Sequence, residues 1–97
     1  MKTLKEIQDT LKVHKAELSE KYRIKEIGIF GSVVRGEQAK SSDVDILVDF
    51  EQVPDLLKFI EIEGCLEKLL RQKVDLVRKP AIRPELKAQI LGETLYI

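Results

Sequence analysis

Two aspartates at the start of an apolar run constrain the fold of this chain more than any other feature. The run, DVDILVDF, begins at Asp43. Because the side chains of a strand alternate between its two faces, Asp43 and Asp45 share one face, about 6–7 Å apart. The other face carries only apolar side chains, namely Val44, Ile46, Val48 and Phe50. The pattern predicts a strand with one apolar face in the core and one acidic, exposed face.

A second strand and a glycine turn are expected just before this run. Residues Ile24 to Phe30 form an apolar segment that stops at Gly31-Ser32. Glycine tolerates backbone angles and close ligand approach that other residues do not. A short helix is expected from Ser32 to Arg35, and its free N–H groups would favour a bound phosphate. A polar loop, Gly36 to Ser42, then leads to the acidic strand.

The remaining elements alternate between helix and strand. Apolar spacing predicts helices over residues 3–22, with Thr3 as cap, and over Asp55 to Arg71, with Pro54 suited to its first turn. The stripe expected on the second helix is Leu56, Phe59, Ile60, Cys65 or Leu66, and Leu69 or Leu70. A third strand is expected over Lys73 to Val77, then a helix from Pro84 to Leu91 with Gly92 as C-cap and Tyr96 packed on the core. The order predicts an α/β (α+β) fold, a small sheet with helices over one face.

Composition narrows the class of protein. The 97 residues suffice for one domain, 1–97, with 43% apolar and 35% charged residues. Seventeen basic and seventeen acidic residues cancel, so net charge indicates neither nucleic acid nor a membrane surface. No apolar run approaches the roughly 20 residues of a membrane span, and no signal peptide is expected. A lone cysteine, Cys65, fits a reducing compartment, so a cytoplasmic protein is expected.

Three aspartates give the predicted site its chemistry. Asp75 lies in the third strand with the same alternation of acidic and apolar faces as Asp43 and Asp45. Neighbouring carboxylates repel one another unless a hard cation such as Mg²⁺ or Mn²⁺ lies between them. Two such ions align an attacking hydroxyl and a leaving phosphate, while the Gly31-Ser32 turn would bind phosphate. Arg35 would neutralise triphosphate charge, and the whole set predicts phosphoryl or nucleotidyl transfer.

The residues present exclude two other ligand-binding motifs. Gly31 and Gly36 match the glycines of a P-loop, but Glu37-Gln38 stand where Lys and Ser or Thr are required. A calcium loop is excluded because Leu47 replaces an oxygen ligand and Val48 the required glycine.

The segment GSVVRGEQAKSSDVDILVDF resembles the signature of the polymerase-β-like nucleotidyltransferases, and most closely that of the minimal nucleotidyltransferases of the MntA type. VDLV at 74–77, the Pro84 helix and the final Tyr-Ile resemble the same proteins. Val34, two residues after Ser32, stands where the family usually has a small residue. The resemblance implies a mixed sheet with flanking helices, two Mg²⁺ ions and ATP. It implies catalytic and metal-binding roles for Asp43, Asp45 and Asp75, and nucleotide-binding roles for Gly31 and Ser32. Arg35 and Ser42 are expected to bind the nucleotide as well.

The resemblance also implies a partner. Minimal nucleotidyltransferases are typically antitoxins of type VII-like pairs, and members transfer AMP to a tyrosine of a HEPN-domain RNase toxin. The chain is too short for an acceptor-binding domain of its own, so another protein is expected to present the acceptor. Two alternatives stay open. One is an antitoxin that neutralises its partner by binding alone. The other is nucleotidyl transfer to RNA, for which Lys73, Arg78, Lys79, Arg83 and Lys87 would supply phosphate contacts. A homo- or hetero-oligomer is compatible with either.

Overall fold

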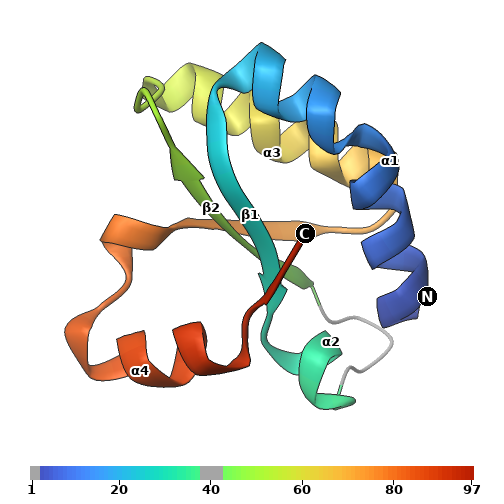
Figure 1. Ribbon diagram of the computed structural model, residues 1–97, viewed down its shortest axis with the longest axis vertical. Coiled ribbons are helices and arrows are strands. Elements are labelled where there is room, and N and C mark those ends of the chain that lie inside the picture. The colour runs from blue at the N-terminus through green and yellow to red at the C-terminus, as the bar shows by residue number, and fades with distance from the viewer. Residues whose placement is uncertain (1–2, 38–42) are drawn as a thin grey trace.

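The computed structural model describes residues 3–37 and 43–97, and its elements are arranged around a four-stranded sheet in the order β3-β2-β1-β4 (Figure 1). The strands are β1 (Ile24–Phe30), β2 (Val44–Phe50), β3 (Val74–Arg78) and β4 (Leu95–Tyr96). Strand β2 is antiparallel to β1 and parallel to β3. The predicted mixed sheet is therefore confirmed, and the acidic run lies on a central strand.

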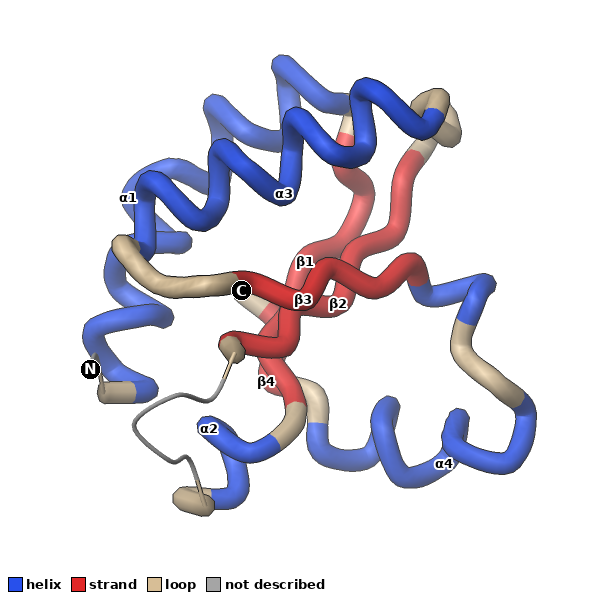
Figure 2. The backbone as a smooth tube through the Cα atoms, turned by 180° about the vertical axis from the view of Figure 1, so that it is seen from behind, coloured by secondary structure: helices blue, strands red, loops and turns tan. Residues whose placement is uncertain are grey.

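Two long helices, α1 (Leu4–Tyr22) and α3 (Leu56–Leu70), cover one face of this sheet, as Figures 1 and 2 show from opposite sides. Helix α1 starts where predicted, because the Thr3 and Glu6 side chains bond each other's backbone N–H groups in a capping box. Helix α3 starts with Asp55 as its cap, whose carboxylate accepts from the Lys58 N–H at 2.8 Å. Pro54 thus precedes the cap instead of lying in the first turn. No helix among the described residues is long and apolar enough to cross a membrane.

The main core lies between the sheet and these two helices. The predicted apolar face of β2 is confirmed, because Val44, Ile46, Val48 and Phe50 are all buried in it. Helix α1 contributes Ile7, Leu11 and Leu18. Burial of apolar surface on this scale is the main stabilising contribution to such a fold.

The stripe expected on α3 is partly wrong. Leu56 and Ile60 are 72% and 54% exposed, whereas Ile62, which was not expected, is fully buried with Leu66 and Leu70. Phe59 packs against the same core from a partly buried position. The helix is apolar on several faces, so periodicity alone does not identify the face that the sheet covers.

The opposite face of the sheet is only partly open, which corrects the prediction of one bare acidic face. A short 3₁₀ turn, η1 (Lys79–Ala81), and helix α4 (Pro84–Glu93) return the chain along this side (Figure 1). Phe30, Leu47 and Ile82 form a second small apolar cluster there, and Leu47 is 1% exposed. Leu47 shares its face of β2 with Asp45, so acidic and apolar side chains adjoin on it.

Two predictions about the C-terminal segment are wrong. Gly92 lies inside α4, which continues to Glu93, and Thr94 follows as the C-cap with its hydroxyl donating to the Ile90 carbonyl at 2.6 Å. Tyr96 is 45% exposed and does not pack in the core. It belongs to β4, which pairs with β1 opposite Gly28.

Strand β3 is an edge of the sheet, and α3 supplies partners for its backbone. The Leu76 N–H donates to the Glu63 carboxylate and the Val74 N–H to the Glu67 carboxylate, each at 3.1 Å. These bonds satisfy main-chain donors at the edge next to Asp75 and fix α3 against the sheet.

Candidate active site

The predicted carboxylates gather at one end of the sheet. Asp45 and Asp75 are register partners on the parallel strands β2 and β3, which places their backbones about 4.8 Å apart. Asp43 directly precedes β2 and is exposed. On the other side of β2, Asp45 is paired with Phe30, the last residue of β1. The structure thus brings the acidic strand start and the glycine turn together, as predicted.

Gly31 lies directly against the Asp45 carboxylate. Its backbone has φ 82° and ψ −154°, a conformation that only glycine adopts readily. A β-carbon at this position would collide with the carboxylate, lying 2.8 Å from Cγ of Asp45. The turn therefore requires glycine both for its backbone angles and for its contact with Asp45.

The carboxyl group of Asp45 has a raised pKa. Burial raises its pKa from 3.8 to about 6, and the negative charges of Asp75 and Asp43 act in the same direction. Arg35 opposes them. The carboxylate is therefore held ionised at neutral pH against both desolvation and like charge, a state that a bound cation relieves.

The three aspartates fit a hard divalent cation by their chemistry, and Asp45 and Asp75 also fit by their register. Carboxylate oxygens are the ligands that Mg²⁺ and Mn²⁺ prefer, and mutual repulsion provides a driving force for ion binding. Across the part of the chain that the structure describes, no three His, Cys, Asp or Glu side chains already converge as a metal-binding group. The fit thus rests on the donor set and on the pairing of Asp45 with Asp75.

Arg35 is engaged by two carboxylates. Its Nε donates to Glu37 at 2.8 Å, and its Nη1 donates to both oxygens of Glu93 at 3.0 and 3.1 Å. Glu93 also accepts from the Gly31 N–H at 3.0 Å. A triphosphate would have to share the guanidinium with these groups.

Glu93 was not found by sequence reasoning. It lies 62 residues after Gly31, and only the return of α4 toward the end of β1 brings them together. One signal was available, because an acidic residue at the C-terminal end of a helix is disfavoured by the helix dipole. Such a residue commonly has a partner elsewhere.

The two predicted serines have different outcomes. Ser32 starts α2 (Ser32–Arg35) beside the carboxylates and is partly buried. Ser42 lies outside the described residues.

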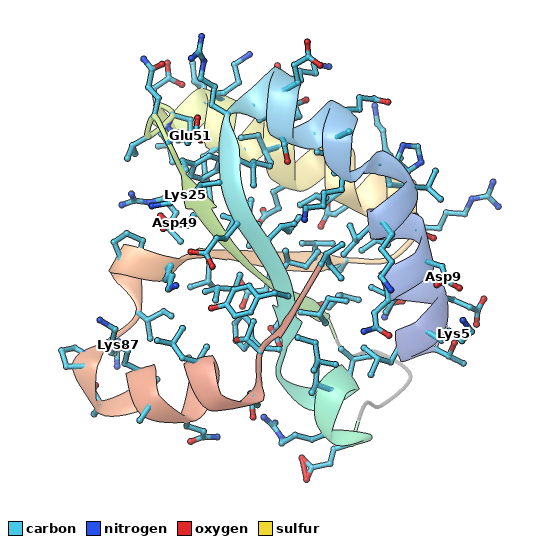
Figure 3. The ribbon with its side chains drawn as sticks, in the orientation of Figure 1. Lys5, Asp9, Lys25, Asp49, Glu51 and Lys87 are labelled. Carbon is cyan, nitrogen blue, oxygen red and sulfur yellow. The ribbon has the colours of Figure 1, made fainter. Side chains whose placement is uncertain are left out.

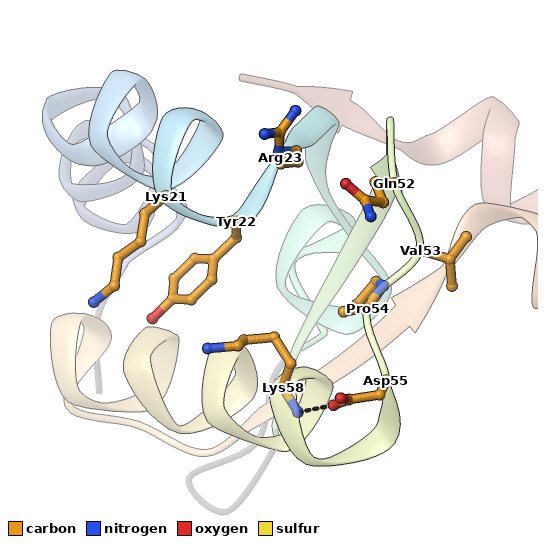
Figure 4. Close-up of a pocket in the computed structure, with 8 residues that line it drawn as sticks. All are labelled: Lys21, Tyr22, Arg23, Gln52, Val53, Pro54, Asp55 and Lys58. Carbon is orange, nitrogen blue, oxygen red and sulfur yellow. Dashed lines mark hydrogen bonds between the residues drawn. The ribbon is translucent and has the colours of Figure 1, made fainter.

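A separate hollow of about 380 Å³ lies at the other end of β2, between the end of α1 and the start of α3 (Figure 4). Its lining includes Lys21, Arg23 and Lys58, so it is partly basic. Asp49, near that end of β2 in Figure 3, is four residues from Asp45, or about 13 Å along a strand. The hollow is not part of the carboxylate site.

The basic residues near the C-terminus include two at opposite ends of β3 and one that is already paired. Lys73 precedes β3 and Arg78 ends it, so they are separated by about 16 Å of strand. Lys79 pairs with Glu26 at 3.3 Å and lies over the Tyr96 ring.

Comparisons with known proteins show the family of this chain and support its fold. Residues 11–97 match the family described as Nucleotidyltransferase domain. The protein adenylyltransferase MntA of Thermococcus cleftensis is 53% identical to this chain, over 100% of the chain and 98% of the relative. A solved minimal nucleotidyltransferase is similar with a TM-score of 0.74 at 33% identity, over 92% of this chain and 93% of that one. A chain of a toxin–antitoxin structure with AMP-PNP is similar with a TM-score of 0.71 at 26% identity, over 87% and 69%.

Proposed function

This chain belongs to the nucleotidyltransferase domain family, in its minimal, MntA-type branch, and from that premise we propose that it is an antitoxin that transfers AMP from ATP to a tyrosine of a HEPN-domain RNase toxin. The observation that carries the proposal is the pairing of Asp45 with Asp75 beside the Gly31 turn. Two relatives support the acceptor and the nucleotide. One is named a protein adenylyltransferase, and the other belongs to a toxin–antitoxin structure with AMP-PNP.

In the proposed reaction, Asp43, Asp45 and Asp75 would hold Mg²⁺. Bound ions would neutralise charge on the triphosphate and polarise its α-phosphoryl group. Burial, and then repulsion from Asp75 and Asp43, raise the pKa of Asp45, and a bound cation would offset this cost of the charged form, which favours ion uptake. Gly31 carries no side chain, which lets phosphate oxygens approach its backbone, and Ser32 is next to it for a hydroxyl contact.

We assign to Asp75 the role of contacting the acceptor tyrosine. It is exposed and lies on the edge strand β3, where another protein can reach it. In this assignment Asp75 orients the tyrosine hydroxyl and takes its proton. The tyrosine oxygen forms a bond to the α-phosphorus of ATP. The bond from the α-phosphorus to the oxygen that bridges to the β-phosphorus breaks, and pyrophosphate leaves.

The test incubates the purified chain with the protein encoded by the adjacent gene, ATP and Mg²⁺, and measures intact and peptide masses. We expect a gain of one or more AMP units on tyrosine. The Asp43→Asn variant should abolish the gain because it removes a carboxylate of the site. The Asp49→Asn variant is the matched control, since it makes the same change near the other end of β2, away from Asp75.

The alternatives predict different results. A tight complex without any mass gain, and with toxin inhibition preserved in Asp43→Asn, would favour an antitoxin that acts by binding alone. Transfer of labelled AMP to RNA, with the neighbouring protein unmodified, would replace a protein acceptor with a nucleic acid.

A further inference from the structure

Glu93 connects the C-terminal helix to the glycine turn of the site. It is the last residue of α4, and its side chain is 16% exposed. One carboxylate oxygen accepts from both the Gly31 N–H and Arg35 Nη1 at 3.0 Å, and the second oxygen accepts from Arg35 Nη1 at 3.1 Å. All three bonds span about sixty residues of sequence, so they depend on the tertiary fold.

Local electrostatics oppose a carboxylate at this place. The C-terminal end of a helix carries partial negative charge, and the Glu93 charge also acts on Asp45 in the direction of repulsion. Helix preference therefore does not explain an acidic residue here. Its charge-assisted bonds to Gly31 and Arg35 are the contacts that offset this repulsion.

The Glu93 carboxylate contacts the backbone of the turn directly. Glycine has more accessible conformations than any other residue, so the backbone at Gly31 needs an external restraint to keep φ 82° and ψ −154°. The Glu93 carboxylate accepts from the N–H of Gly31. The carbonyl of Gly31 in turn accepts from the Val34 and Arg35 N–H groups at 3.1 and 3.2 Å. Holding Gly31 thus also sets the start of α2, where Ser32 lies.

We infer that Glu93 is a positioning residue of the nucleotide site, which acts through Gly31 and Arg35 to hold the turn in the conformation that receives a triphosphate. The inference rests on the proposed function, because it assigns the turn to nucleotide. It makes the C-terminal end of α4 part of the site.

The test is binding of AMP-PNP with Mg²⁺ to the full chain, measured by calorimetry below the unfolding temperature of every variant. Glu93→Ala should weaken binding about tenfold or more, since it removes charge-assisted bonds and lowers the population of the receptive turn. Glu93→Gln keeps an oxygen for the Gly31 N–H and should recover part of the affinity. Glu85→Gln, an exposed position in the first turn of the same helix, should bind as the wild type does.

A second measurement separates positioning from helix anchoring. If the proposed transfer occurs, Glu93→Ala should raise the KM for ATP, while the KM for the acceptor protein stays within twofold. A lowered melting temperature with unchanged affinity of the folded protein would overturn the inference, and so would tighter binding, which would make Glu93 a competitor of phosphate. Absence of binding by the wild type would instead overturn the proposed function and this inference together.

Discussion

Removing the charge of Asp45 should stabilise the protein while it abolishes activity. The pKa of this carboxyl group rises from 3.8 to about 6 on folding, chiefly through burial, and then through Asp75 and Asp43. A pKa difference of roughly 2 between the folded and unfolded states lowers the free energy of unfolding by about 3 kcal/mol at pH above 6. Because the side chain is only partly buried, water and salt screen it, and a gain of about 1–2 kcal/mol is the realistic expectation for Asp45→Asn.

The pH dependence gives the prediction its sign. The folded-state pKa lies above the unfolded-state value, so the folded protein binds the proton first as pH falls. The unfolding free energy contributed by Asp45 therefore increases from pH 7.5 down through 6 toward 3.8. Asp45→Asn should be more stable than the wild type at pH 7.5, and the difference should shrink by pH 5.

Urea unfolding without divalent ions, at pH 7.5 and pH 5, measures this difference. Asp49→Asn is the control, because its amide oxygen can still accept from the Phe50 N–H. Added Mg²⁺ should stabilise the wild type and leave Asp45→Asn nearly unchanged. Equal or lower stability of Asp45→Asn at pH 7.5, or a difference independent of pH, would refute the account of a repelled carboxylate.

Three further changes test separate parts of the structure. Gly31→Ala should lower the free energy of unfolding in urea by at least about 1 kcal/mol and reduce AMP-PNP binding, because φ 82° and the Asp45 carboxylate both exclude a β-carbon. A variant as stable as the wild type would contradict the turn geometry. Asp75→Asn should lower the pKa of Asp45 in a carboxyl NMR titration, since the Asp75 charge raises it; an unmoved titration would show that the two do not interact. Thr3→Ala should cost about 1 kcal/mol by removing the capping box with Glu6, and an unchanged urea midpoint would mean that this end of α1 contributes nothing.

The strands and the acidic site were predictable because their signals are local. The period-two alternation from Val44 to Phe50 identifies the apolar face of β2, and the structure confirms that face. The place of Gly31 followed from the end of the apolar run of β1. Asp75 was found because β3 repeats the alternation of acidic and apolar side chains.

The contacts that depend on distant segments were not predictable. Glu93 reaches Gly31 only because α4 folds back, and nothing in the residues around position 93 specifies that path. The burial of Leu47 depends on Ile82 in the same way. On α3 the failure had another cause, since a helix that is apolar on several faces leaves the choice between Ile60 and Ile62 to tertiary packing.

The carboxylates of Glu63 and Glu67 have a consequence for recognition. An uncovered strand edge pairs with extended segments of other chains, which permits both partner binding by strand addition and aggregation. Because α3 already occupies the N–H groups of Val74 and Leu76, β3 offers no donors there to an incoming strand. In the function that we propose, an acceptor protein would therefore approach Asp75 with side chains instead of with a strand of its own.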